Sequence, residues 1–236
     1  MYAPHFAVGQ DSATKLYLLS GLARYATRVR IRGFDNDGNP LGETERELAA
    51  DSDGLLLAGD LGELLSLSPT TRQDGLLEGY LQLDFSLTRG PALLFARPRV
   101  LGTVAVTRGG ARTVLPLAAA SGSLNSSFLQ VAHTGQPDGN MYTALWVLNP
   151  GPETAMVRVR VFDQTGRPSA SERILAIAPG VRNGGELEDP LLFGAAFRQV
   201  GGHLQVSSDR PVISFAVFGD RAGQFLAAIP GRPTLP

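Results

Sequence analysis

The sequence predicts an all-β protein of two tandem antiparallel β-sandwich domains, related by internal duplication and each with at most one short helical turn. Three observations support this. A strand-and-hairpin pattern occurs twice, further matches follow it in the same order, and apolar residues alternate with polar ones at the two-residue period of a half-buried strand. The 28 Gly and 16 Pro among 236 residues add frequent turn signals between such strands.

The clearest copy is a strand followed by a tight turn. VRIRGFDNDGNP spans Val29–Pro40, and VRVRVFDQTGRP spans Val157–Pro168, 128 positions later. Alternation of Val or Ile with Arg places apolar side chains on one face and guanidinium groups on the other. Gly38 and Gly166 supply the positive φ that a tight hairpin needs. Each copy therefore predicts an antiparallel hairpin.

Further matches extend the repeat along the chain. They pair YLLSG with LWVLN, GYLQLDF (79–85) with GHLQVSS (202–208), and GTVAV (102–106) with ISFAV (213–217). The offset falls from 123 to 111, so the first copy has extra residues, which we place in SLTRGPALLFARP. A repeat of roughly 115 residues has the size of a whole β-sandwich domain.

The domain division follows from the repeat. We expect one domain over 1–119 and another over 120–236, joined within the small, polar segment Leu117–Ser127. Asp60 and Glu63 have the spacing of a capping box, and Asp189 is a cap residue before a proline. Each domain is thus predicted to hold one short helical turn.

Composition excludes several classes of protein. The net charge is −1 and no basic stripe is visible, so we expect no nucleic-acid partner. The chain has no cysteine, which excludes disulfides and thiolate metal sites. No apolar run approaches the ~20 residues of a membrane span, so no membrane insertion is expected. The opening MYAPHFAVGQ lacks the regions of a signal peptide, and we expect the chain to begin at a mature domain.

The richest group of side-chain oxygens is DNDGN, with Asp35 and Asp37 as candidate calcium ligands. Gly38 is fourth in this segment, whereas an EF-hand loop has Gly sixth, and the second copy lacks one of the carboxylates. Turn formation accounts for every residue of the segment. We therefore expect a turn here, and no cofactor.

Aromatic residues supply the other candidates. Trp146, Tyr142 and Tyr80 are the candidate ligand-binding residues, although the apolar strand around Trp146 favours an interior position for its ring. Phe34 and Phe162 each fall on the arginine side of their strand. They are candidates either for folding over the hairpin end or for docking against another surface.

Catalytic motifs are missing from the sequence. It contains no G-x-S-x-G, no phosphate-binding loop, no H-E-x-x-H and no cysteine nucleophile. The chain is therefore expected not to be an enzyme.

Three segments resemble a known group of proteins. Pro4–Ala7 (PHFA), the Phe34–Pro40 hairpin and Ser208–Gly219 (SDRPVISFAVFG) resemble the uncharacterised tandem β-sandwich repeats of large secreted or surface proteins from environmental bacteria. The resemblance spans nearly the whole chain, but the second copy lacks PHFA and the first lacks the SD-x-PV segment. It implies Ig-like, extracellular domains and no chemistry.

We therefore expect a non-catalytic structural or adhesive module of a secreted or cell-surface protein, with a protein or a surface glycan as partner. Two alternatives remain open. One is a carbohydrate-binding module, and the other is a subunit that self-assembles by pairing open sheet edges.

Overall fold

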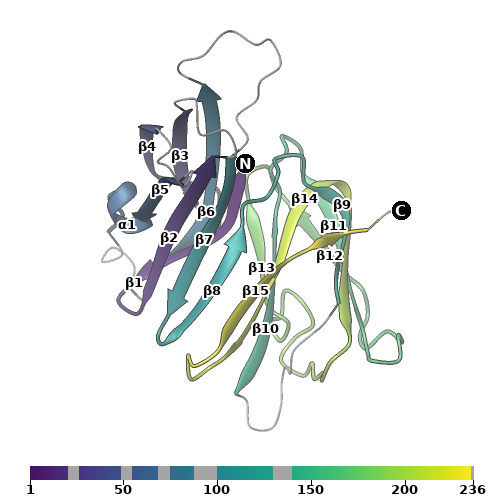
Figure 1. Ribbon diagram of the computed structural model, residues 1–236. Helices are drawn as coiled ribbons and strands as arrows, with labels where there is room; N and C mark the ends of the chain where they lie inside the picture. The colour runs from purple at the N-terminus through teal and green to yellow at the C-terminus, as the bar shows by residue number, and fades with distance from the viewer. Residues whose placement is uncertain (21–26, 49–54, 69–74, 88–99, 130–139, 235–236) are drawn as a thin grey trace. The chain divides into compact units, whose positions relative to one another are not determined.

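The computed structural model describes residues 1–20, 27–48, 55–68, 75–87, 100–129 and 140–234 (Figure 1). The all-β prediction is confirmed: the described residues form two antiparallel eight-stranded sheets and one short helix. That helix has four residues, and nothing in the described chain is a helix long and apolar enough to cross a membrane.

The first sheet contains strands β1 to β8. Its hydrogen-bonded order is β4-β3-β6-β1-β2-β7-β8, and β5 pairs with β2. The strands and the helix that follows β5 are β1 (Tyr2–Gly9), β2 (Ser12–Ser20), β3 (Thr27–Asp35), β4 (Pro40–Leu48), β5 (Leu55–Asp60), α1 (Leu61–Leu64), β6 (Leu76–Leu87), β7 (Val100–Arg108) and β8 (Ala111–Pro116).

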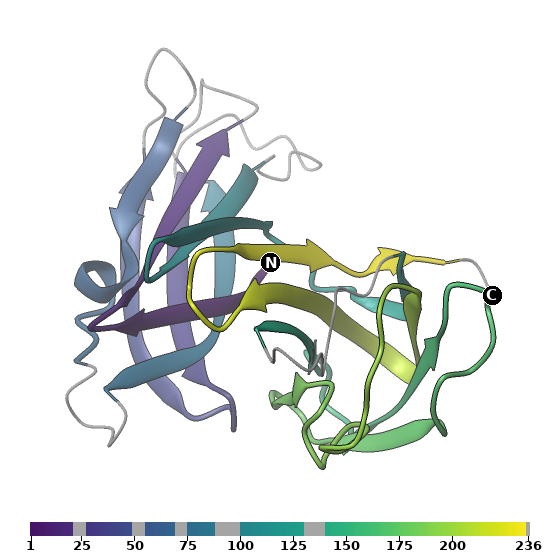
Figure 2. The same cartoon turned by 90° about the horizontal axis from the view of Figure 1, so that it is seen from below.

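The second sheet contains strands β9 to β16. Its main order is β12-β11-β14-β10-β13, with β9 and β15 also on β14 and β16 on β9. The strands are β9 (Ser123–Phe128), β10 (Met141–Leu148), β11 (Ala155–Phe162), β12 (Arg173–Ile177), β13 (Arg182–Glu186), β14 (His203–Asp220), β15 (Leu226–Pro230) and β16 (Arg232–Pro233). Strands β14 and β15 run side by side, yellow in Figure 2.

The chain forms two compact units. The first comprises Met1–Asp35, Asn39–Thr107 and Val114–Ala119, and the second comprises Asn36–Gly38, Arg108–Thr113 and Ala120–Pro236.

Four strand pairings of the first sheet recur in the second, as the duplication predicts. The hairpin β3–β4 corresponds to β11–β12, and the pairing of β3 with β6 corresponds to that of β11 with β14. Likewise β1–β6 corresponds to β9–β14, and β2–β5 to β10–β13. The long strand β14 of the second sheet corresponds to two strands of the first sheet, β6 and β7. Residues 88–99 separate β6 from β7 in the sequence, where we placed the extra residues of the first copy, and they lie outside the described residues.

Strand β14 holds the second sheet together across two layers. Its first part pairs with β11 and β9, and its last part, from Ile213, pairs with β10 and β15. The register with β9 shifts between Ser207 and Val212, next to the exposed strand residues Asp209–Pro211. A strand that changes partners in this way makes the corner of a sandwich-like fold.

The core of the second sheet lies between these layers. Its buried cluster includes Phe128, Leu145, Val159, Leu204 and Phe218, contributed by four different strands. Because alternate residues point to opposite faces, these strands need only every second position to be apolar. In β11 the alternation read from the sequence therefore identifies the inner face.

Local turn predictions have mixed outcomes. Asp60 caps α1 as expected, since its Oδ1 accepts hydrogen bonds from Gly62 N at 2.9 Å and Glu63 N at 3.4 Å. Asp189 accepts from Leu191 N, but the residues after it form turns and no helix. Gly38 and Gly166 both have φ of 82°, which confirms the two hairpins.

The predicted join over Leu117–Ser127 is partly wrong. Residues 123–128 form strand β9, with Ser126 and Phe128 buried. Serine and asparagine read as linker residues in isolation, but Ser126 is small enough to face the core, and β14 supplies the hydrogen-bond partners that make the segment a strand.

Candidate functional site

The three predicted ligand-binding aromatic residues are largely enclosed, since Tyr80 and Tyr142 are buried and Trp146 is half-buried. Tyr80, on β6 in the first unit, is 3% exposed. Its ring stacks on Phe34 with centroids 5.2 Å apart and planes 14° apart, and Tyr2 packs on it at 6.2 Å. A ring covered in this way is part of the packing and offers no platform for a sugar.

Tyr142 and Trp146 share one face of β10, opposite the core residues Leu145 and Val147. Trp146 is half-buried, so the expectation of an interior position is wrong for this ring: it faces away from the core cluster. Arg182, which is 2% exposed, holds its guanidinium carbon 4.5 Å from the centre of the Trp146 ring. This contact is a cation–π interaction.

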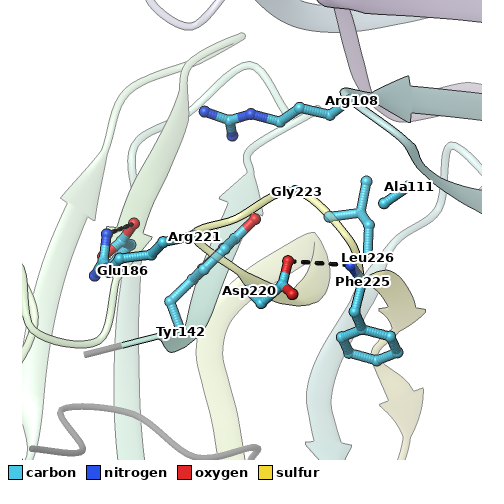
Figure 3. Close-up of a pocket in the computed structure, with 9 residues that line it drawn as sticks. All are labelled: Arg108, Ala111, Tyr142, Glu186, Asp220, Arg221, Gly223, Phe225 and Leu226. Carbon is cyan, nitrogen blue, oxygen red and sulfur yellow. Dashed lines mark hydrogen bonds and ion pairs between the residues drawn. The ribbon is translucent and has the colours of Figure 1, made fainter. Parts of the chain in front are cut away.

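Tyr142 lines a hollow of about 180 Å³ in the second unit, shown in Figure 3. Its lining residues are Arg108, Ala111, Tyr142, Glu186, Asp220, Arg221, Gly223, Phe225 and Leu226. Ligand pockets usually measure ~300–1,000 Å³, so this one is small.

Three polar side chains of the hollow, Glu186, Asp220 and Arg221, have hydrogen-bond partners within the protein. Arg221 bonds both carboxylate oxygens of Glu186, at 2.5 and 3.2 Å, and reaches Glu188 at 3.2 Å. The hydrogen bond to Glu186 raises the pKa of Arg221. Asp220 Oδ1 accepts from the backbone N–H groups of Gln224 and Phe225, which closes the β14–β15 turn. The bond from Phe225 is drawn in Figure 3. These groups therefore stabilise the protein's own structure.

A second hollow, of about 290 Å³, is lined by Ala120, Ser121, Pro150, Gly151, Pro152, Glu153, Arg210 and Pro211. Its one ion pair joins Arg210 to Glu153 at 2.5 Å, between half-exposed side chains. The lining offers no group of polar atoms that point toward a common ligand.

The candidate calcium ligands lie at the β3–β4 turn. The Asp35 carboxylate accepts from Asn39 N at 2.9 Å and from Asn39 Nδ2 at 3.1 Å, and Asp37 is exposed. In the second copy, Asp163 accepts from Thr165 N, Thr165 Oγ1 and Arg167 N, and the Thr165 hydroxyl lowers the pKa of Asp163 most. Both aspartates thus close their hairpins.

Within the described part of the chain, no three His, Asp or Glu side chains come together as a metal site. His5 lies on β1 and His203 on β14, and His133 is outside the described residues.

Phe34 and Phe162 lie on the arginine side of their strands, as expected, and each stacks on the residue opposite it. Phe34 faces Tyr80, and Phe162 faces His203, with ring centroids 4.7 Å apart and planes 9° apart. The sequence missed these pairs, although the matching positions of Tyr80 and His203 were a usable signal.

Tyr80 and His203 are each preceded by a glycine, and a close backbone contact requires both glycines. A Cβ on Gly79 would lie 1.9 Å from Phe34 O, and one on Gly202 would lie 2.1 Å from Phe162 O. In both sheets the backbone just before Tyr80 or His203 therefore lies against the backbone carbonyl of the phenylalanine opposite. Only glycine fits in this space.

The outer side of β11, β14, β9 and β16 carries a regular grid of polar side chains. Directly opposed residues of antiparallel strands point to the same face. One row across the strands is Arg160, Gln205, Ser127 and Arg232, and the next is Arg158, Ser207 and Asn125. We call these seven residues the outer arginine face.

The arginines of this face are exposed and share few carboxylates. The side chains of Arg158 and Arg160 are 58% and 47% exposed, and Arg232 is also exposed. Arg158 bonds Glu172 at 2.9 Å, whereas Arg160 Nε is 3.9 Å from the same carboxylate, beyond hydrogen-bond distance.

The corresponding side of the first sheet has a different charge balance. Arg28, Arg30 and Arg32 of β3 pair with Glu45, Glu43 and Asp84 respectively, at 3.3, 2.7 and 2.6 Å. Glu47 lies opposite Arg28 as well. Among the described residues, four carboxylates thus lie beside three guanidinium groups in the first sheet, whereas Glu172 is the carboxylate paired with arginines of the outer arginine face.

No protein-family model matches the chain, and no curated protein does. A crystal structure of Thermotoga maritima 1070 is similar over 48% of this chain and 96% of its own, with 15% identity and a TM-score of 0.40. A glycosyl hydrolase family 2 member from Bacteroides cellulosilyticus DSM 14838 and a β-glucuronidase of family 2 each show 10% identity and a TM-score of 0.21.

The two glycoside hydrolases are much longer proteins. They cover 97% and 96% of this chain, which spans only 27% and 23% of theirs. None of these likenesses assigns a function. The class that the fold defines is an all-β protein of two antiparallel sheets that share several strand pairings.

Proposed function

We propose that this protein is a non-catalytic adhesive module, built from two Ig-like domains, of a secreted or cell-surface bacterial protein. The observation that carries the proposal is that the candidate functional side chains have the same structural roles in both sheets. In both sheets an aspartate closes the hairpin, a phenylalanine stacks on the opposite ring, and a glycine allows the close approach. Residues fixed in these roles support a rigid scaffold for an exposed binding surface.

The surface location is supported by the resemblance of three segments to tandem repeats of secreted and surface proteins. It is tested by labelling intact cells of the source bacterium with an antibody against the chain. We expect labelling without permeabilisation. Labelling that needs permeabilised cells would contradict the location.

The adhesive role has its own test. Beads coated with the full chain should be retained on surfaces coated with cell-wall polysaccharide, extracellular matrix protein or mucin more than beads coated with an unrelated β-sandwich domain. Equal retention on every surface would reject adhesion and leave a structural spacer.

The alternative of a carbohydrate-binding module based on Trp146, Tyr142 and Tyr80 has little support, because Tyr80 and Tyr142 are buried and the Trp146 ring packs against Arg182. The self-assembly alternative stays open. Strand β12 ends its sheet and carries Ile174 with 53% exposure, so another copy could pair with that edge. Light scattering over a range of concentrations separates an assembling subunit from a monomer.

A further inference from the structure

The outer arginine face extends across four strands, which suits a polymer better than a small molecule. Neighbouring strands lie ~4.8 Å apart and alternate residues of one strand ~6.8 Å apart. Arg160 and Arg232 are three strand steps apart in the same row, so their backbones are separated by roughly 14 Å. The arginines are therefore spread over a distance that several monomers of a polymeric ligand would cover.

The charge of the face favours an anionic partner. Glu172 is the carboxylate that the described residues bring to Arg158 and Arg160, and its stronger contact is with Arg158. Asp209 lies at the end of the strands, where its Oδ1 accepts from Met156 N at 2.8 Å. Guanidinium groups bind carboxylates through paired N–H donors, so Arg160 and Arg232 suit carboxylate ligands.

The groups between the arginines favour a hydroxyl-rich ligand. Gln205, Ser207, Ser127 and Asn125 are all partly exposed and offer amide and hydroxyl groups that both donate and accept hydrogen bonds. At the end of the same strands lies the half-buried Phe162–His203 ring pair. Nucleic-acid binding depends on neutralising many phosphates, and a face with three arginines on a chain of net charge −1 is poorly suited to it.

We propose that the outer arginine face binds an acidic polysaccharide whose sugars carry carboxylate groups. The proposal rests on the adhesive function above and names the class of its ligand. Arg160 and Arg232 hold carboxylates, while the amide and hydroxyl side chains between them bond sugar hydroxyls. Ionic contacts of this exposed kind weaken as salt is added.

The test is affinity electrophoresis of the full chain in gels that contain polygalacturonate, with neutral dextran gels for comparison. We expect retardation by polygalacturonate only, reduced between 50 and 200 mM salt. Arg160→Gln and Arg232→Gln should each weaken the affinity about tenfold, as loss of a charge-assisted hydrogen bond predicts. Thermal unfolding of each variant should stay close to that of the unmodified protein.

The matched control is Arg30→Gln. Arg30 occupies an outer position of β3 with 49% exposure, and the variant changes the net charge equally, but Arg30 bonds both oxygens of Glu43. This variant should keep the affinity within about twofold of the unmodified protein's. An equal loss in Arg30→Gln would show a non-specific charge effect and overturn the proposal.

Other results would also overturn it. Equal retardation by dextran would show that binding does not depend on the charge of the polysaccharide. Equally tight binding of an oligothymidylate would identify a nucleic-acid surface. If coated beads adhere to protein surfaces while polygalacturonate does not bind, the ligand class is wrong and the adhesive function stands. If neither binds, both fail.

Discussion

Replacing Gly202 with alanine tests the close approach of β14 to β11. Gly202 has φ of 89°, and an added Cβ would lie 2.1 Å from Phe162 O and 2.5 Å from Gln199 Nε2. Gln199 Nε2 donates to that same carbonyl and to Gly201 O, so neither neighbour can move freely. The substitution should therefore strain the backbone next to the Phe162–His203 ring pair.

The size of the effect follows from two contributions. A left-handed backbone costs alanine about 1–2 kcal/mol, and forcing an extra methyl group into a packed site costs about 1–3 kcal/mol. Gly202→Ala should thus lower the free energy of unfolding by about 2–5 kcal/mol. Gly166→Ala is the control, because Gly166 has φ of 82° with nothing within 4 Å of its Cβ position, and only the first contribution applies.

Urea unfolding followed by tryptophan fluorescence measures the difference. Trp146 is the only tryptophan and lies in the second unit, as do both glycines. With a denaturant slope of ~2 kcal/mol/M, the Gly202→Ala midpoint should fall ~0.5–1.5 M below that of Gly166→Ala. Midpoints that coincide would refute the close approach and, with it, the account of the paired rings.

Two further predictions concern the second unit. The pKa of Asp163 is lowered below 3.8 by the Thr165 hydroxyl, so its stabilising contribution is present above that pH and is lost as pH falls through the lower folded value. The melting-temperature gap between the unmodified protein and Asp163→Asn should therefore be largest near pH 7 and disappear in strong acid. A gap independent of pH would contradict this role. Phe128→Ala, at a 1% exposed core position, should cost about 3–5 kcal/mol in denaturant unfolding. Leu129→Ala, 72% exposed, should stay within about 0.5 kcal/mol, and similar losses in the two variants would place the core elsewhere.

Much of the fold could be predicted because its signals are local. Alternation in Val157–Val161 specifies a strand and its inner face, and the glycines at 38 and 166 specify where the chain turns. Strand β9 could not be predicted in the same way. Its residues Ser123–Phe128 have weak strand preference and become a strand through hydrogen bonds to β14, about 80 residues further along the chain.

The candidate site depended even more on long-range pairing. Phe34 and Phe162 were identified from their unusual positions, but their stacking partners come from strands about 40 residues away. Trp146 was assigned to the interior because both faces of its strand are apolar. The neighbouring strands determine which of the two apolar faces meets the core. In β10 the core face carries Leu145 and Val147, and Trp146 lies on the other face.

By itself, the sequence determined an all-β chain with one pattern copied along it, because a two-residue period and turn-forming glycines act over a few neighbours. Only the tertiary structure decided how closely each arginine is paired with a carboxylate. Arg30 and Arg160 look alike in their alternating strands. Their surroundings differ because strand register, set by side chains packed in the core, determines which residues of the next strand lie beside them.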